Sequence, residues 1–223
     1  MLILLLISSL YFVDQPYPLP PGHGVFNVEL RFGPDGGVLC YFNVGIWDRF
    51  GLGLSYGASN LVGYGDPEFY EQPGVQIRVL AIEEDAFYPS LFFGFDNQGY
   101  GAYTDRYNIR SKGLYAQLAK SLGFAKVTIV PSLGFNYCFE SDNGVDIFSG
   151  FMAKFGNSGA LLVDYALNLN DPDDQNKGYL NVGLRLLFYG EMFFEFSLRD
   201  LLGNNQGDQQ FNRCIKLGFE QSF

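Results

Sequence analysis

Apolar and polar residues alternate with a period of two from Gly24 to the end of the chain. In the first such segment, residues 26–32, every second residue is apolar, and Asn27, Glu29 and Arg31 lie between them. Successive side chains of a β-strand point to opposite faces, so this segment has one apolar and one polar face. The pattern recurs and predicts twelve strands, at residues 26–32, 38–46, 52–57, 75–79, 90–96, 114–118, 127–136, 145–155, 161–169, 179–188, 194–199 and 215–220. Between these strands, only residues 103–110 permit a turn of helix.

The lengths of the connections between these strands distinguish between two possible folds. A soluble β-sandwich turns its apolar faces inward, whereas a membrane barrel turns them outward to lipid. Short connections, at 48–50, 83–86, 121–125, 156–159 and 189–191, alternate with long ones, at 59–72, 97–111, 138–144, 170–177 and 201–210. Only the short 33–37 turn departs from this alternation, which is typical of outer-membrane barrels with short periplasmic turns and long outer loops. We therefore expect an all-β fold, a single antiparallel up-and-down transmembrane β-barrel of about twelve strands. A soluble secreted carbohydrate-binding β-sandwich is the alternative.

The polar face carries charges of both signs on a chain whose net charge is −10. The basic residues on this face are Arg31, Arg78, Lys154, Arg185, Arg199 and Lys216, and the acidic ones are Glu29, Asp96, Asp146, Asp164, Glu195 and Glu220. Paired charges suit a narrow lumen, and twelve strands leave only a narrow passage. Charges on its wall would set solute selectivity. The lumen-lining candidates are Glu29, Arg31, Arg78, Asp164, Arg185, Glu195 and Arg199.

The last strand ends the chain with alternating apolar residues, Ile215, Leu217 and Phe219, and a final Phe223. This ending resembles the C-terminal signature of bacterial outer-membrane β-barrel proteins, from which Gln221 departs. The resemblance implies a Gram-negative-type envelope, contact with outer-membrane lipid, and recognition of the last strand by the barrel-assembly machinery. Residues 73–77 and 89–96 also resemble the YjbH-type barrel domain, which is linked to exopolysaccharide export.

Residues 1–23 differ from the rest and are expected to form a leader before a barrel domain at 24–223. Residues 1–10 resemble the apolar region of a secretory signal peptide, without a positively charged start or a clear small-residue cleavage site. Four prolines between residues 11 and 23 favour an extended segment. No later apolar run reaches the length of a transmembrane helix.

Composition and candidate catalytic residues argue against several classes of function. The acidic net charge argues against nucleic-acid binding, which needs clustered basic residues. The cysteines at 40, 138 and 214 do not have the spacing of metal ligands, although the sequence permits a Cys138–Cys214 disulfide. The only histidine, His23, lies in the leader, where it could not complete a Ser-His-Asp triad on an outer strand face.

Two acidic clusters complete the candidates. Residues 83–85 are expected in a solvated turn, and residues 171–174, in an outer loop, lack the glycine and distal glutamate of a calcium-binding EF-hand. We therefore expect no catalytic residue, metal or cofactor. The sequence favours a non-enzymatic, porin-like narrow channel, or a structural or export-associated barrel, with small solutes or polysaccharide as partners. A barrel enzyme that acts on lipid or polysaccharide through a carboxylate pair is the other alternative.

Overall fold

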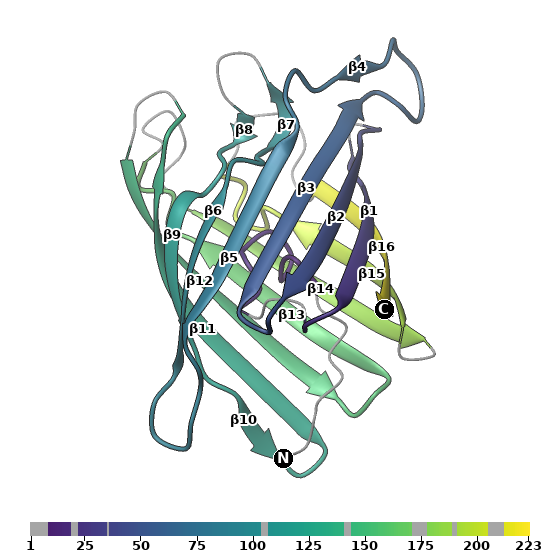
Figure 1. Ribbon diagram of the computed structural model, residues 1–223. Helices are drawn as coiled ribbons and strands as arrows, with labels where there is room; N and C mark the ends of the chain where they lie inside the picture. Colours follow the sequence, from purple (N-terminus) through teal and green to yellow (C-terminus); the bar gives the residue numbers. More distant parts are fainter. Residues whose placement is uncertain are drawn as a thin grey trace.

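The computed structural model describes residues 9–18, 22–34, 36–103, 107–140, 144–170, 178–188, 191–204 and 212–223. No helix in these residues is long and apolar enough to cross a membrane. Twelve strands close into one barrel (Figure 1): β1 (Val25–Phe32), β2 (Val38–Ile46), β3 (Phe50–Ser59), β5 (Gly74–Ile82), β6 (Ser90–Asp96), β9 (Gly113–Ala119), β11 (Val127–Cys138), β12 (Gly144–Phe155), β13 (Gly159–Ala166), β14 (Tyr179–Phe188), β15 (Met192–Arg199) and β16 (Asn212–Ser222). Four short strands lie outside this ring: β4 (Glu68–Phe69), β7 (Tyr100–Tyr103), β8 (Tyr107–Ile109) and β10 (Leu122–Phe124).

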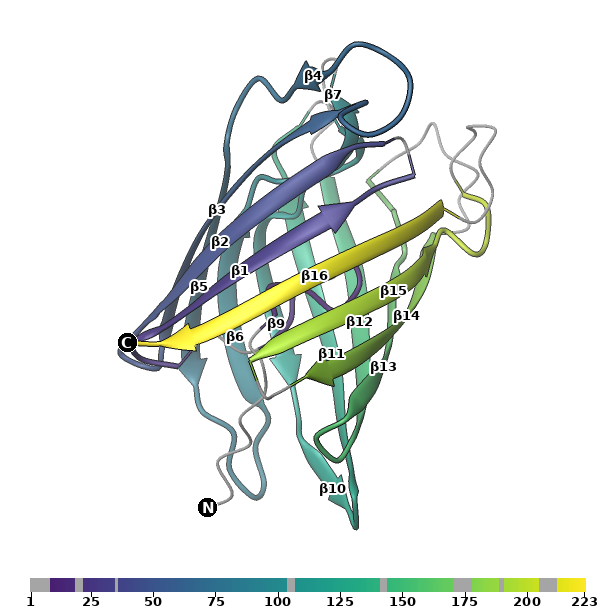
Figure 2. The same cartoon turned by 90° about the vertical axis from the view of Figure 1, so that its right-hand side faces the viewer.

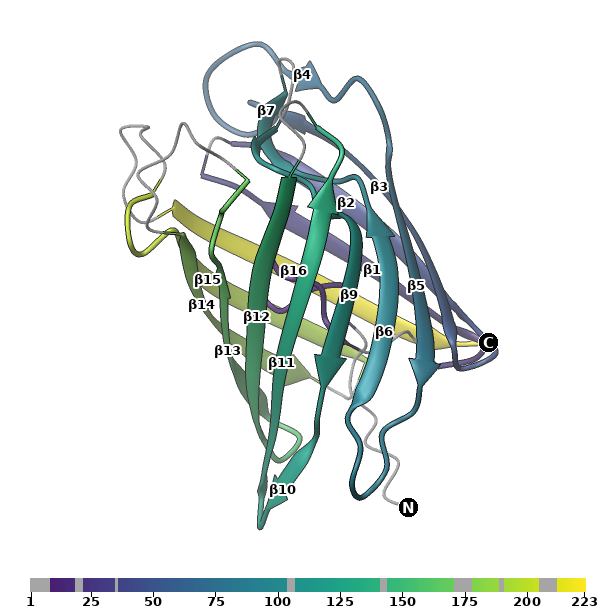
Figure 3. The same ribbon diagram turned by 90° about the vertical axis from the view of Figure 1, so that its left-hand side faces the viewer.

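Every barrel strand pairs antiparallel with the barrel strands before and after it in sequence, and the last pairs with the first. The pairing of β16 with β1 runs from Val25↔Ser222 to Phe32↔Ile215 (Figure 2). On the opposite side of the ring, β9 lies between β6 and β11 (Figure 3). A closed ring leaves no unpaired sheet edge, which is the condition for a sheet to lie in lipid. The predicted twelve-stranded up-and-down barrel is confirmed.

The two faces of the barrel wall are inverted relative to a soluble protein. Apolar side chains such as Leu54, Leu133 and Phe135 lie on the outer face and are more than half exposed. On the inner face, Glu29, Glu195 and Lys216 are completely buried. An apolar outside and a polar inside are the arrangement of a membrane barrel. The β-sandwich alternative, which would bury the apolar face, is therefore wrong.

The connections also follow the predicted alternation. Figure 1 shows β4, β7 and β8 in the long connections at the upper end and β10 in a turn at the lower end. The C-terminus is joined to the start of β1, since the Phe223 N–H donates a hydrogen bond of 2.8 Å to the Gly24 carbonyl oxygen. The last and first strands are therefore fastened together at the short-turn end.

Two local expectations are corrected by the structure, and one open alternative is decided. The described part of residues 103–110 is not helical, because β7 and β8 pair antiparallel there, with Tyr103 opposite Tyr107. The strand expected at 161–169 ends at Ala166, because Asn168 has a left-handed backbone (φ 59°) that a strand does not tolerate. The Cys138–Cys214 disulfide is absent, since both thiols are free.

Candidate functional site

The N-terminal segment occupies the interior of the barrel. Residues 9–18, which we call the plug, lie inside the ring of strands, where Figure 1 shows them as a purple loop. The loop is closed on itself, because the Tyr17 N–H donates to the Leu10 carbonyl oxygen (3.0 Å) and the Phe12 N–H to the Gln15 carbonyl oxygen (2.9 Å). Every residue from Leu10 to Tyr17 is buried. The lumen is therefore filled by a segment that belongs to none of the barrel strands.

The tip of the plug is held by a carboxylate on β13. Asp164 Oδ2 accepts hydrogen bonds from three successive backbone N–H groups, those of Val13 (2.9 Å), Asp14 (2.7 Å) and Gln15 (3.0 Å). Its other oxygen, Oδ1, accepts a bond of 2.7 Å from Asn181 Nδ2. Hydrogen bonds to an ionised acceptor are stronger than neutral ones. Asp164 therefore fixes the backbone of the tip.

The side chain of Asp14 points from the tip into a pair of arginines. Arg31 on β1 donates to Asp14 Oδ1, and Arg199 on β15 donates to Asp14 Oδ2 at 2.6 Å. Both guanidinium groups also lie over the ring of Tyr100, with their carbons 4.0 and 4.8 Å from its centre. Burial by itself raises the pKa of Asp14, but Arg199 and Arg31 outweigh it and hold that pKa well below its usual range. Asp14 is therefore ionised and clamped by two cations, an arrangement we call the latch.

A second group of charges binds the carbonyl oxygens of the plug. Arg185 donates to Ser9 Oγ (3.1 Å) and to the carbonyl oxygens of Tyr11 (3.2 Å) and Phe12 (3.3 Å). Lys216 donates to the carbonyl oxygens of Val13 (2.7 Å) and Phe12 (3.2 Å). Glu195 lies between these two cations, 2.6 Å from the Arg185 guanidinium and 3.2 Å from the Lys216 ammonium. Glu195 therefore offsets half of their charge and orients both toward the plug.

Further wall residues bind the two ends of the plug. Arg78 donates to the Tyr17 carbonyl oxygen (3.2 Å) and Gln117 to the Pro16 carbonyl oxygen (2.9 Å). At the other end, Glu29 accepts from the Leu10 N–H at 2.9 Å. Most of these contacts join residues far apart in the sequence. Arg78 lies 61 positions after Tyr17, and Arg199 lies 185 positions after Asp14. The separations are shorter for Arg31 and Glu29, which lie on the first strand.

One side of the plug packs against apolar wall residues. Phe12, Val13 and Tyr17 form a buried cluster with residues of β11, β12 and β13. The Phe12 ring lies over Gly150, where an added Cβ would stand 2.1 Å from a ring carbon. Gly150 therefore leaves the recess that accepts this ring, since any larger residue would overlap it.

The structure places all seven lumen-lining candidates on the inner wall and brings them together around the plug. Six of them contact it directly: Glu29, Arg31, Arg78, Asp164, Arg185 and Arg199. The seventh, Glu195, acts through Arg185 and Lys216. Sequence reasoning missed their common partner, because it treated residues 11–23 as an extended leader that precedes the barrel domain and gave it no contact with the barrel wall. The apolar sequence Tyr11-Phe-Val13 could have indicated the plug, because such residues are usually buried and a solvated leader does not need them.

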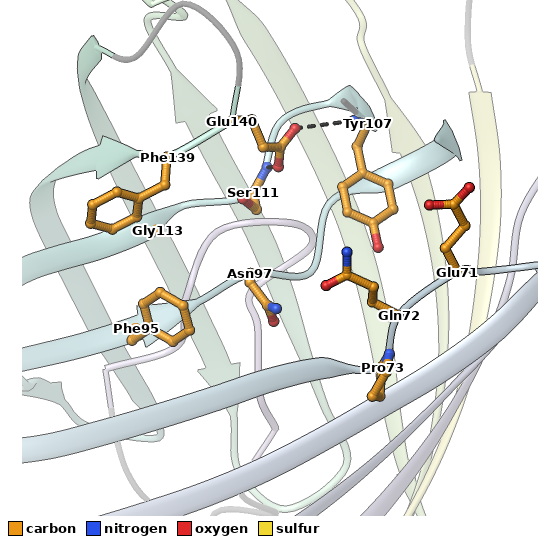
Figure 4. A pocket seen from close by; sticks show the side chains of 10 residues that line it. All are labelled: Glu71, Gln72, Pro73, Phe95, Asn97, Tyr107, Ser111, Gly113, Phe139 and Glu140. Atoms are coloured by element: carbon orange, nitrogen blue, oxygen red, sulfur yellow. Dashed lines mark hydrogen bonds between the residues drawn. The ribbon is translucent and has the colours of Figure 1, made fainter. Parts of the chain in front are cut away.

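A separate pocket of about 260 Å³ lies at the long-loop end of the barrel (Figure 4). Phe95 and Phe139 line one side of it, and Glu71 and Glu140 contribute carboxylates. Glu140 accepts hydrogen bonds from the backbone N–H groups of Tyr107 (3.0 Å) and Ser111 (2.8 Å). Glu140 is thus used to fix the connection that holds β7 and β8.

The remaining candidate chemistry lies away from the lumen. His23 is exposed, and its Nδ1 accepts a bond of 3.2 Å from the Trp47 N–H. The acidic turn is structural, since Asp85 accepts from the N–H groups of Phe87 and Tyr88, which lowers its pKa. The acidic cluster at 171–174 lies outside the described residues. Within the described residues, no group of three or more His, Cys, Asp or Glu side chains is placed to hold a metal ion.

Comparisons with known proteins support the same architecture. No protein-family model and no curated protein matches the chain. Among solved structures it is similar to the KdgM porin, with a TM-score of 0.55 and 10% identity over 89% of this chain and 99% of that one. It is also similar to an outer membrane channel from Pseudomonas putida F1, with a TM-score of 0.50 and 13% identity over 97% of this chain and 100% of that one. The fold is that of outer-membrane channel barrels. At such low identity the likeness extends to the fold alone.

Proposed function

We propose that this protein is a non-enzymatic channel of a bacterial outer membrane, closed at rest by the plug. The observation that carries the proposal is that a separate chain segment fills the lumen and is held there mainly by charged wall residues. Polar contacts of this kind can be exchanged for contacts with water, because a hydrated lumen satisfies the same donors and acceptors. A barrel that served only as a membrane anchor could fill its interior with wall side chains.

Release of the plug would leave a narrow polar passage. Twelve strands enclose more space than the side-chain-filled eight-stranded barrels and less than the open porins. The freed Arg31, Arg199, Arg185 and Asp164 would then line the passage and select solutes by charge. Small polar solutes, or a polysaccharide chain in extended form, are the ligands that fit this proposal.

The location and partners follow from the outer surface. The apolar outer face would contact outer-membrane lipid, and the last strand would be recognised by the barrel-assembly machinery. In support, Phe223 lies at the end of β16 with its ring centre 6.4 Å from that of Phe26, and its backbone is bonded to Gly24. The two structural neighbours are barrels of other kinds and lend no support to the resemblance to YjbH-type domains, which stays a prediction.

A structural or export-associated barrel that stays plugged is the second candidate. The apolar cluster of Phe12, Val13 and Tyr17 with the wall favours it, because these side chains would lose their burial if the plug moved into water. The two candidates differ in one property, namely whether the barrel conducts once the plug is absent.

Deletion of residues 10–18 tests the proposal. The purified deletion variant and the full protein are compared in planar-bilayer recordings, after heat-modifiable gel migration has shown that each barrel is folded. We expect steady conductance from the deletion variant and little from the full protein. Deletion of residues 61–66, an exposed part of the connection before β4, is the control and should leave the full protein's behaviour unchanged. A folded deletion variant without conductance would leave the structural candidate.

A further inference from the structure

Among the residues that the structure describes, Glu29 is a buried carboxylate without a cation. Its side chain on β1 is 0% exposed, and none of these residues forms a hydrogen bond with its Oε2 atom. Its one bond to a described residue is with a neutral group, the backbone N–H of Leu10, 2.9 Å from Oε1. In the part of the chain that the structure describes, no Lys or Arg forms an ion pair with it, although Arg31, Arg185 and Lys216 pair with other carboxylates of the lumen.

Such a carboxylate is costly unless a positive charge lies beside it. An ion taken out of water loses several kcal/mol of hydration, which only a close counter-charge and full hydrogen bonding offset. The other acidic residues that hold the plug are better satisfied. Asp14 has two arginines, and Glu195 has an arginine and a lysine. Asp164 is in no ion pair among the described residues, but it accepts four hydrogen bonds that serve both of its oxygens. Glu29 has a single peptide N–H, which can serve only one of its two oxygens.

Small residues lie directly before this N–H. Residues 1–10 resemble the apolar region of a secretory signal peptide, and the apolar run of residues 1–7 is followed by Ser8 and Ser9, although a full small-x-small site is absent because Ile7 takes the place of its first small residue. Cleavage after Ser9 would turn the Leu10 nitrogen from a peptide N–H into a free α-ammonium group. That group carries a positive charge and three donors, so it could bind both oxygens of Glu29.

We propose that the mature protein begins at Leu10, and that its α-ammonium forms a buried ion pair with Glu29. A signal-peptide-cleaving endopeptidase of the envelope would hydrolyse the Ser9–Leu10 peptide bond. Water supplies the oxygen that completes the new carboxylate of Ser9, and its two protons convert the Leu10 N–H into the α-ammonium group. Residues 1–9 leave with that carboxylate, and the plug remains as residues 10–18.

The contacts of Ser9 are consistent with its loss. Its hydroxyl accepts one of the Arg185 bonds at 3.1 Å, donates to the Tyr11 carbonyl oxygen at 3.0 Å and accepts a long bond of 3.4 Å from the Tyr11 N–H. Without Ser9, Arg185 keeps Glu195 and two plug carbonyl oxygens, one of them that of Tyr11, and the long bond of the Tyr11 N–H is lost. The Tyr17 N–H still donates to the Leu10 carbonyl oxygen, so the loop stays closed after cleavage. After cleavage, the chain would therefore begin inside the barrel with the Leu10 α-ammonium beside the Glu29 carboxylate of the wall.

Mass spectrometry of the protein purified from the envelope, with N-terminal sequencing, tests the position of the cut. We expect a chain that starts at Leu10. A chain that keeps Met1, or one that starts at any residue other than Leu10, overturns the proposal. This measurement does not depend on conductance, so it is decided separately from the proposed channel function.

Amine labelling tests the ion pair in the folded barrel. An amine-reactive reagent should modify Leu10 slowly in the native protein, and the Glu29→Gln variant should be modified at least about tenfold faster, because the ammonium loses its counter-charge. The control is Glu220→Gln, the same change on neighbouring β16, which should label like the natural protein. Equal labelling of the Glu29→Gln variant and the natural protein, with the barrel folded in both, would also overturn the proposal.

Discussion

Replacement of Asp14 by Asn is the sharpest test of the latch. The change keeps the size of the side chain but removes the negative charge between Arg31 and Arg199, which are both almost fully buried. Removal of one partner from a buried ion pair costs about 3–5 kcal/mol, since it leaves an uncompensated charge. We expect the closed state to lose about that much relative to the open state. Because each 1.36 kcal/mol is a factor of ten, the open population should rise by roughly 100- to 5,000-fold.

The chain carries its own reporter for this opening. Cys214 faces the lumen on β16, is 1% exposed, and accepts a hydrogen bond from Arg31 Nε at 3.2 Å. With Cys40 and Cys138 replaced by Ala, a charged methanethiosulfonate reagent can reach the remaining thiol only when the plug has moved. The labelling rate of Cys214 therefore follows the open population.

The matched control is Glu83→Gln. It removes an ion pair with Arg49 at the same 2.6 Å distance as the Arg199–Asp14 contact, but on the surface, where both side chains are about half exposed or more. Exposed pairs contribute about 0–1 kcal/mol, so this variant should label like the natural protein. If Asp14→Asn, with a folded barrel, also labels at the natural rate, the latch does not hold the plug and the reasoning fails.

Three further predictions use the same reporter or the bilayer recordings. In Gly150→Ala, the added methyl group should overlap the Phe12 ring, destabilise the closed state by roughly 1–3 kcal/mol and raise the Cys214 labelling rate about tenfold. The control Gly123→Ala has open space around it and should label like the natural protein, and equal rates in the two variants would contradict the recess. Asp164→Asn should raise labelling roughly 100-fold, because three charge-assisted bonds each weaken by about 1 kcal/mol, and an unchanged rate would show that the tip is held otherwise. Since the pKa of Asp14 is lowered in the closed state, the latch is fully formed above the ordinary carboxyl pKa of about 4 and weakens as the pH falls below it. Bilayer recordings should therefore show that the difference in conductance between the natural protein and Asp14→Asn is present at neutral pH and narrows below about pH 4. A difference that is unchanged well below that pH would refute this.

The sequence by itself determined the wall of the barrel. The alternation of residues 26–32 gives the orientation of Glu29 and Arg31, because side-chain direction in a strand is a local property with a period of two. The alternation of short and long connections then selects the barrel over the sandwich. Local irregularities could not be predicted from the sequence pattern. Asn168 is an example, because its left-handed backbone ends β13 although the alternation continues past it.

Only the tertiary structure decided what the inward charges bind. Asp14 meets Arg199 across 185 positions, and the Val13 carbonyl oxygen meets Lys216 across 203. No periodicity links such residues, because their contact exists only after the ring has closed around the N-terminal segment. The same holds for Glu29, whose burial beside the Leu10 nitrogen depends on where the plug lies in the lumen. The sequence thus determined which faces are polar, and the closed barrel determined their common partner.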